Sequence, residues 1–111
     1  MNMVEYYVYI LANKRNGTLY VGMTKDIAKR VVRHKGRRAN QFAAKYDVDK
    51  LAYYEKVGSL EGAIKREKQL KKWRRSWKMN LIEDLNPNWK DLFGEVIKMN
   101  LNPGPPVAKP R

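Results

Sequence analysis

The chain has 111 residues, of which 43% are hydrophobic, so it has the size of one domain with a single modest core. Its 24 Lys and Arg residues against 11 Asp and Glu residues give a net charge of +13, which predicts a polyanionic partner, with nucleic acid ahead of an anionic membrane surface. The lack of cysteine excludes disulfides, thiolate catalysis and Cys-ligated zinc, and no apolar run approaches the roughly 20 residues that a membrane span needs.

A hairpin of two strands is predicted at the start of the chain. Residues 6–12 and 18–23 are rich in tyrosine and β-branched residues and alternate well enough for strands. Asn16 and Gly17 lie between them and form a strong short-range turn signal.

A helix and a third strand are predicted next. Residues 24–35 have helical spacing, with Thr24 or Asp26 available as the N-cap. A polar connection over residues 36–49 then leads to a strand over residues 51–57.

Two further helices complete the predicted fold. Residues 60–73 follow Ser59 and residues 77–85 follow Ser76, and both serines are suitable N-caps. Asn86 and Pro87 end the second helix.

The order β-β-α-β-α-α predicts an α/β (α+β) fold, a small, mostly antiparallel three-stranded sheet flanked by helices. We expect a domain over residues 1–98, in which the short segment 89–93 packs back onto the sheet, and a Pro-rich disordered tail over residues 99–111. The N-terminus has no basic segment ahead of a long apolar stretch, so we expect a cytoplasmic protein without membrane attachment.

Tyr9 and Tyr20 are predicted to lie on the same face of the hairpin. Both a two-residue turn at Asn16-Gly17 and a longer loop that pairs Leu11 with Tyr20 give this result, because the two registers have the same parity. Only the longer loop makes the tyrosines diagonal neighbours. They form either a cross-strand packing pair or a pair of hydroxyls that act on one group.

Arg30 and His34 are four residues apart and project from the same side of the predicted helix. Both lie along or beside its apolar stripe, which includes Ile27 and Val31. Such an arginine can bind a phosphate and such a histidine can transfer a proton. The alternative is an arginine that extends to solvent and a histidine that is satisfied inside the domain.

Glu67 is an acidic residue in the middle of an apolar stripe. A carboxylate in this position is costly unless it is paired or binds a metal. An ion pair with a neighbouring basic residue and a functional role are equally consistent with the pattern. The stripe consists of Leu60, Ala63, Ile64 and Leu70, with Trp73 beyond it.

The segment 65–78 carries eight cations with Trp73 and Trp77 interleaved. The cations cannot all share one helix face, so some are simply solvated. Basic residues with aromatics nevertheless suit phosphate contact and base stacking. The predicted nucleic-acid-binding residues are Lys65, Lys68, Lys71, Lys72, Trp73, Arg74 and Arg75.

The spacing of these residues resembles the GIY-YIG endonuclease superfamily, most closely its small stand-alone bacterial members, and is similar to the N-terminal nuclease domain of UvrC. The first triplet of the family falls on residues 7–9 (YVY) and the second on residues 20–22 (YVG), about ten residues later. The expected arginine and histidine then fall on Arg30 and His34, and the usual metal-binding glutamate falls on Glu67.

The resemblance covers about residues 6–85, with some departures. Tyr7 replaces the leading glycine of the first triplet, and valine replaces isoleucine at Val8 and Val21. Met23 stands where excision-repair members carry a lysine. An asparagine that some members use near the end of the domain is not assigned to a position.

The resemblance implies metal-dependent hydrolysis of a phosphodiester by five catalytic residues. Glu67 would hold one Mg²⁺ or Mn²⁺ and Arg30 would bind the scissile phosphate. Tyr20 would act as the base while Tyr9 and His34 orient or relay the proton, and His34 is the alternative acceptor. The expected substrate of this monomeric enzyme is DNA, cut with low sequence specificity and by structure, such as flaps or branches, in repair or recombination.

Two other classes of function remain open from the sequence. A non-catalytic module that binds DNA or RNA would keep the charge and the tryptophans, with the tyrosines as sheet packing. A small basic protein associated with RNA or ribosomes is the third class.

Overall fold

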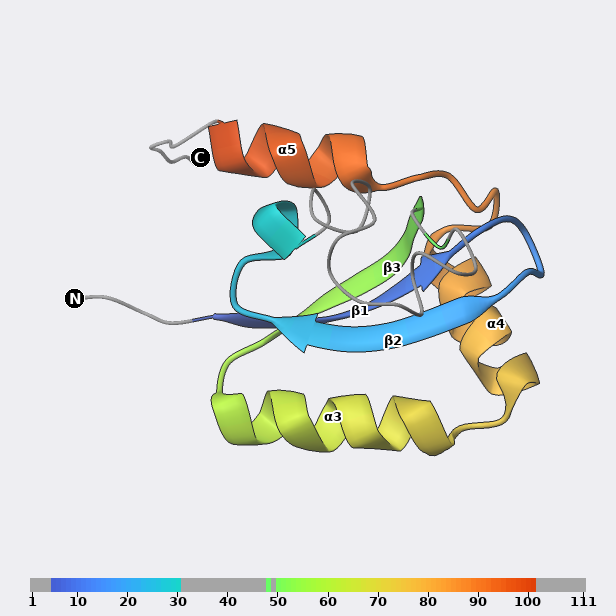
Figure 1. Cartoon of the computed structure of the whole chain (residues 1–111), viewed down its shortest axis with the longest axis horizontal. Helices are drawn as coiled ribbons and strands as arrows, with labels where there is room; N and C mark the ends of the chain where they lie inside the picture. The colour runs from blue at the N-terminus through green and yellow to red at the C-terminus, as the bar shows by residue number, and fades with distance from the viewer. Residues whose placement is uncertain (1–4, 31–47, 49, 102–111) are drawn as a thin grey trace.

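A computed structural model of the chain describes residues 5–30, 48 and 50–101. Its sheet lies between helices, with α3 on one side and α5 on the other (Figure 1). A first helical turn after the second strand spans residues 27–30. The elements are β1 (Tyr6–Ala12), β2 (Leu19–Thr24), β3 (Lys50–Val57), α3 (Leu60–Lys72), α4 (Arg75–Leu85) and α5 (Phe93–Leu101).

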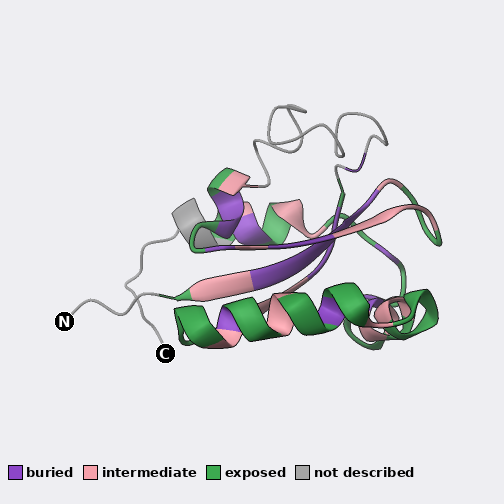
Figure 2. Cartoon of the chain, turned by 60° about the horizontal axis from the view of Figure 1, so that its bottom comes forward, coloured by how far each residue is buried: buried purple, intermediate pink, exposed green. Residues whose placement is uncertain are grey.

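The three strands form one antiparallel sheet in the order β2-β1-β3, which confirms the predicted α+β fold. β1 is central and covered on both faces, so its residues from Val8 to Ala12 are all buried (Figure 2). Figure 2 also shows that α3 turns an exposed side away from the sheet. The alternating side chains of β1 therefore belong to two separate layers of core.

The two layers differ in the helices that complete them. Val8 and Ile10 point toward α3 and α4 and pack with Ala63, Leu70 and Ile82. The opposite face carries two side chains of β1 that pack with residues from the helical turn after β2 and from α5. The buried members of this second layer are Tyr9, Leu11, Ile27, Ala28, Val48, Leu51 and Val96.

The hairpin uses the longer of the two predicted loops. Leu11 pairs with Tyr20, so the loop runs from Asn13 to Thr18. The Asn13 side chain accepts a hydrogen bond from the Thr18 amide at 3.0 Å, and Asn16 takes a left-handed conformation with φ of 57°. These local bonds support the wider loop over a two-residue turn.

The predicted helix boundaries are partly confirmed. Ser59 caps α3 by accepting a hydrogen bond from the Gly62 amide at 3.0 Å. Asp26, one of two predicted caps, accepts from the Lys29 amide at 3.0 Å. The prediction for Ser76 is wrong, because α4 begins at Arg75 and Ser76 already lies within its first turn.

Asn86 ends α4 as predicted, and it is buried. Its side-chain amide donates to the carbonyl oxygens of Ala52 at 2.9 Å and Lys90 at 2.8 Å, which ties the end of α4 to β3. The segment after it then packs back as expected. α5 continues to Leu101 and so includes the first residues of the predicted tail, whose remainder lies outside the described residues.

The predicted stripe of α3 needs a correction. Ala63 and Leu70 are fully buried, but Leu60 and Ile64 are 48% and 38% exposed. The small Ala63 lets the helix approach the sheet along the line that it shares with Leu70, which leaves Leu60 and Ile64 on a flank. In the described residues no helix is long and apolar enough to cross a membrane.

Candidate active site

Tyr9 lies directly opposite Gly22 in the hairpin, and its ring covers that glycine. A β-carbon built on Gly22 would lie 2.5 Å from the Tyr9 hydroxyl oxygen and 2.7 Å from the ring carbon that carries it. Real β-carbons do not approach so closely, so only glycine leaves room for this ring. Gly22 of the second triplet therefore allows the Tyr9 ring of the first triplet to pack over β2.

Tyr20 lies two residues before Gly22 on β2, diagonal to Tyr9. The two ring centroids are 6.4 Å apart, with the planes at 64° to each other. Tyr9 is fully buried, whereas Tyr20 is only partly covered. The predicted juxtaposition is confirmed, and it puts one buried and one partly exposed tyrosine on the same face.

The Tyr9 hydroxyl is influenced by three other candidate residues. Burial raises its pKa well above the ordinary value, and the electrostatic interactions with Tyr20 and Glu67 act in the same direction. Arg30 opposes them through its positive charge and a hydrogen bond to the Tyr9 side chain. Because the net effect is a raised pKa, Tyr9 stays protonated at neutral pH and can donate a hydrogen bond.

Arg30 reaches this point because the link between β2 and the next helix is short. The Thr24 hydroxyl accepts a hydrogen bond from the Asp26 amide at 3.1 Å, and Asp26 then caps the helical turn. The Arg30 amide donates to the Asp26 carbonyl at 3.0 Å and closes that turn. His34, the next predicted member, lies outside the described residues.

Glu67 comes from α3, on the opposite face of the sheet from the tyrosines. Its side chain is 20% exposed, and Lys71 lies 3.1 Å away on the next turn. The predicted ion pair is therefore present, and its Lys71 side chain is 53% exposed. The charge of the same carboxylate also acts on the Tyr9 hydroxyl, where it is the smallest of the influences that set the pKa.

A single carboxylate limits the metals that suit the site. In the described residues no group of three or more His, Cys, Asp or Glu side chains could enclose an ion. A structural zinc site needs such a group, but Mg²⁺ keeps most of its waters and accepts one or two carboxylates. Glu67 thus fits a hydrated magnesium or manganese ion and not a closed metal centre.

The predicted nucleic-acid-binding residues do not gather on one face. Lys65, Lys68 and Lys72 are exposed along the outer side of α3. Arg75 instead donates to the backbone carbonyl of Asn16 at 2.6 Å and fastens the hairpin loop to α4. The remaining members, Lys71, Trp73 and Arg74, are exposed except for the half-buried Trp73.

One ion-pair network was missed by sequence reasoning. Arg66 lies 2.7 Å from Glu55 of β3, and the Tyr53 hydroxyl donates to the same carboxylate at 2.5 Å. Arg66 also lies 5.3 Å from the centroid of the Trp73 ring. This network could not be predicted, because no spacing in the sequence connects β3 with α3. The role of Gly22 was also missed, but it follows from the longer hairpin register, which places Gly22 opposite Tyr9.

The chain was compared with protein families at this point. A family model described as the GIY-YIG catalytic domain matches residues 5–80. The chain belongs to this family. The matched range contains β1, β2, β3 and α3. It therefore includes the candidate residues Tyr9, Tyr20, Arg30 and Glu67, and a nuclease domain explains why they occur in one chain.

Relatives of this GIY-YIG protein are small bacterial proteins. The UPF0213 protein of Syntrophus aciditrophicus is 42% identical over 77% of this chain and 97% of its own length. A UPF0213 protein of Staphylococcus saprophyticus is 33% identical over 74% of this chain and 99% of its own length. The solution structure of a UPF0213 protein from Bacillus halodurans shares the fold, with a TM-score of 0.50 and 24% identity over 78% of this chain and 92% of that one.

Proposed function

We propose that the protein is a metal-dependent DNA endonuclease that works as a cytoplasmic monomer. It hydrolyses phosphodiester bonds with low sequence specificity, selects DNA by structure and acts in repair or recombination. The observation that carries the proposal is the grouping of Tyr9, Tyr20 and Arg30 on one face of the hairpin, with the charge of Glu67 acting on the Tyr9 hydroxyl, in a chain of net charge +13 that belongs to a nuclease family.

Glu67 holds the divalent ion, Mg²⁺ or Mn²⁺, in this proposal. When bound, the ion supplies Lewis-acid stabilisation of negative charge on the reacting oxygens. Displacement of Lys71 frees the carboxylate for this role, because an exposed ion pair contributes only about 0–1 kcal/mol. Arg30 binds the scissile phosphate and offsets the charge that grows on it.

Proton transfer divides between the two tyrosines. Tyr20 is the accessible hydroxyl and acts as the base that activates water, with His34 as the proton relay. Tyr9 does not act as the base, because its raised pKa keeps the proton in place. It donates a hydrogen bond that orients the reacting groups.

Basic residues of α3 and the following loop bind the DNA backbone. Their contact is with phosphates, which explains low sequence specificity and requires an affinity that falls with salt. The proposed nucleic-acid-binding residues are Lys65, Lys68, Lys71, Lys72, Trp73, Arg74 and Arg75.

The experiment that tests the function is cleavage of labelled duplex, single-stranded and branched DNA with Mg²⁺, Mn²⁺ or EDTA. We expect cleavage that EDTA abolishes and that Glu67→Ala loses, while DNA binding stays near that of the wild type. Glu61→Ala is the matched control, because it removes an exposed carboxylate from the first turn of the same helix. Full activity of Glu67→Ala would disprove the metal-binding role.

The second candidate is a nucleic-acid-binding module that does not cut. The ion pair between Glu67 and Lys71 favours it, because that pair gives the carboxylate a structural role without a metal. Binding without cleavage in the wild type and in Glu67→Ala alike would support this function over the nuclease, with RNA as the next ligand to test.

A further inference from the structure

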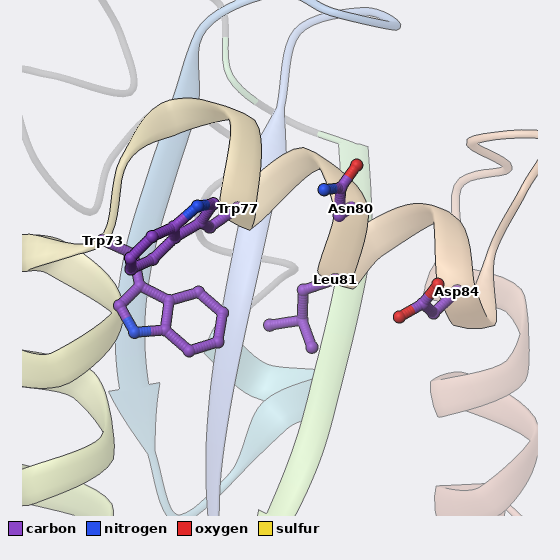
Figure 3. A pocket seen from close by; sticks show the side chains of 5 residues that line it. All are labelled: Trp73, Trp77, Asn80, Leu81 and Asp84. Atoms are coloured by element: carbon purple, nitrogen blue, oxygen red, sulfur yellow. The ribbon is translucent and has the colours of Figure 1, made fainter.

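A groove runs along α4 where it meets the end of α3 (Figure 3). Its volume is about 310 Å³, at the lower end of the roughly 300–1,000 Å³ typical of small-molecule sites. The residues that line it are Trp73, Trp77, Asn80, Leu81 and Asp84. None of them is a candidate catalytic residue, and Trp73 alone is among the predicted nucleic-acid-binding residues.

Two tryptophans form the apolar end of the groove. Trp77 is 49% exposed, and its ring meets that of Trp73 edge-on, with centroids 5.9 Å apart and planes at 85°. The Arg74 guanidinium lies 5.4 Å from the Trp77 centroid. A half-exposed indole held by two neighbours offers a stacking surface at a low cost in side-chain entropy.

The other end of the groove is polar and carries a negative charge. Asn80 and Asp84 project from successive turns of α4 (Figure 3). The Asp84 carboxylate repels a phosphate but accepts hydrogen bonds from the amino group of a nucleobase, and the Asn80 amide pairs with base edges. The groove therefore suits a base and excludes the DNA backbone.

Cations beside the groove supply the contacts for that backbone. Lys72 and Arg74 are exposed on either side of Trp73, where α3 ends. Exposed Lys68 lies one turn before Lys72 on the outer side of α3, so cations continue from the groove along that side of the helix.

We propose that this groove binds an unpaired base of single-stranded DNA, with Trp77 as the stacking surface and Asp84 as the acceptor for an amino group. The proposal rests on the proposed function and names its substrate class, DNA in which a single-stranded segment adjoins the strand that is cut. Adenine, cytosine and guanine carry such amino groups and thymine does not, so the groove favours the first three.

The test measures binding of the full-length protein in EDTA, where cleavage does not interfere. The probes are a fluorescent single strand of mixed adenine and cytosine, the same strand with abasic sites, and a thymine-only strand of equal length. The wild type is expected to bind the intact strand about 5- to 150-fold more tightly than the abasic strand, which is the stacking contribution of one base.

Trp77→Ala should lose this difference and bind the abasic strand as the wild type does. Leu85→Ala is the matched control, because Leu85 is a 70% exposed apolar residue on the same helix outside the groove lining. Asp84→Asn, an exposed substitution that does not threaten folding, should reduce the preference for the mixed strand over the thymine strand.

Two results would overturn the proposal: equal binding of intact and abasic strands by the wild type, or an unchanged difference in Trp77→Ala. If either result occurs while the protein still cleaves DNA in Mg²⁺, the proposed nuclease function stands and only the proposed role of the groove is disproved. If the intact strand binds more tightly than the abasic strand but no DNA is cleaved, the role of the groove stands and the nuclease function is disproved.

Discussion

Replacement of Gly22 by alanine is expected to displace the Tyr9 ring and thereby disable the site. The new β-carbon would lie 2.5 Å from the Tyr9 hydroxyl oxygen, whereas ordinary contact begins at 3.4 Å, so the ring must move by about 1 Å. Tyr9 is fully buried, so we expect overpacking to cost about 1–3 kcal/mol of unfolding free energy.

The same displacement moves the hydroxyl away from Arg30 and Glu67. A misplacement of about 1 Å can lower a catalytic rate by about 10²-fold. The assay is single-turnover cleavage of branched DNA at a temperature where the variant is folded, with thermal unfolding measured alongside. Ile82→Val is the stability control, because it weakens the core on the opposite face by about 0.5–1.5 kcal/mol and leaves Tyr9 in place.

A double variant separates the clash from a general loss of stability. Tyr9→Phe removes the atom that a β-carbon at position 22 would meet first, so it should recover part of the stability of Gly22→Ala without recovering activity. Wild-type cleavage and wild-type unfolding in Gly22→Ala would refute the placement of the Tyr9 ring over Gly22.

Three further outcomes are expected. Because the pKa of Tyr9 is raised in the folded state, its contribution to stability is complete below the unfolded pKa of about 10 and is lost as pH rises above it. The thermal unfolding temperature should therefore fall less steeply with pH, between about pH 8 and 11, in Tyr9→Phe than in the wild type. Equal slopes in the two proteins would contradict the raised pKa of Tyr9. Lys68→Ala should reduce the salt dependence of DNA binding by about one phosphate contact, whereas Lys56→Ala, on β3 and paired with Glu5, should leave the slope unchanged. Asn86→Ala should cost about 1–3 kcal/mol in urea unfolding, because it leaves buried backbone groups without partners, and should not change cleavage per folded molecule.

Local patterns in the sequence were enough to predict the three strands, α3 and α4 and the faces on which the tyrosines lie, whereas α5 was not predicted as a helix. Alternation of side chains assigns a strand residue to one face, so the parity of the hairpin put Tyr9 and Tyr20 on the same face before the loop length was known. The cap at Ser59 and the end of α4 at Asn86 are equally local, because each depends on hydrogen bonds within a few residues. The position of Glu67 between Ala63 and Leu70 also follows from helical spacing alone.

Contacts between distant elements were decided only by the tertiary structure. The rotation of α3 about its axis, which exposes Leu60 and Ile64, depends on how closely Ala63 approaches the sheet. The partner of Arg66 comes from β3, and periodicity carries no information about pairs on different elements. The choice of hairpin register places the Tyr9 ring over Gly22, and this steric fit between two strands is the physical reason why the site needs glycine there.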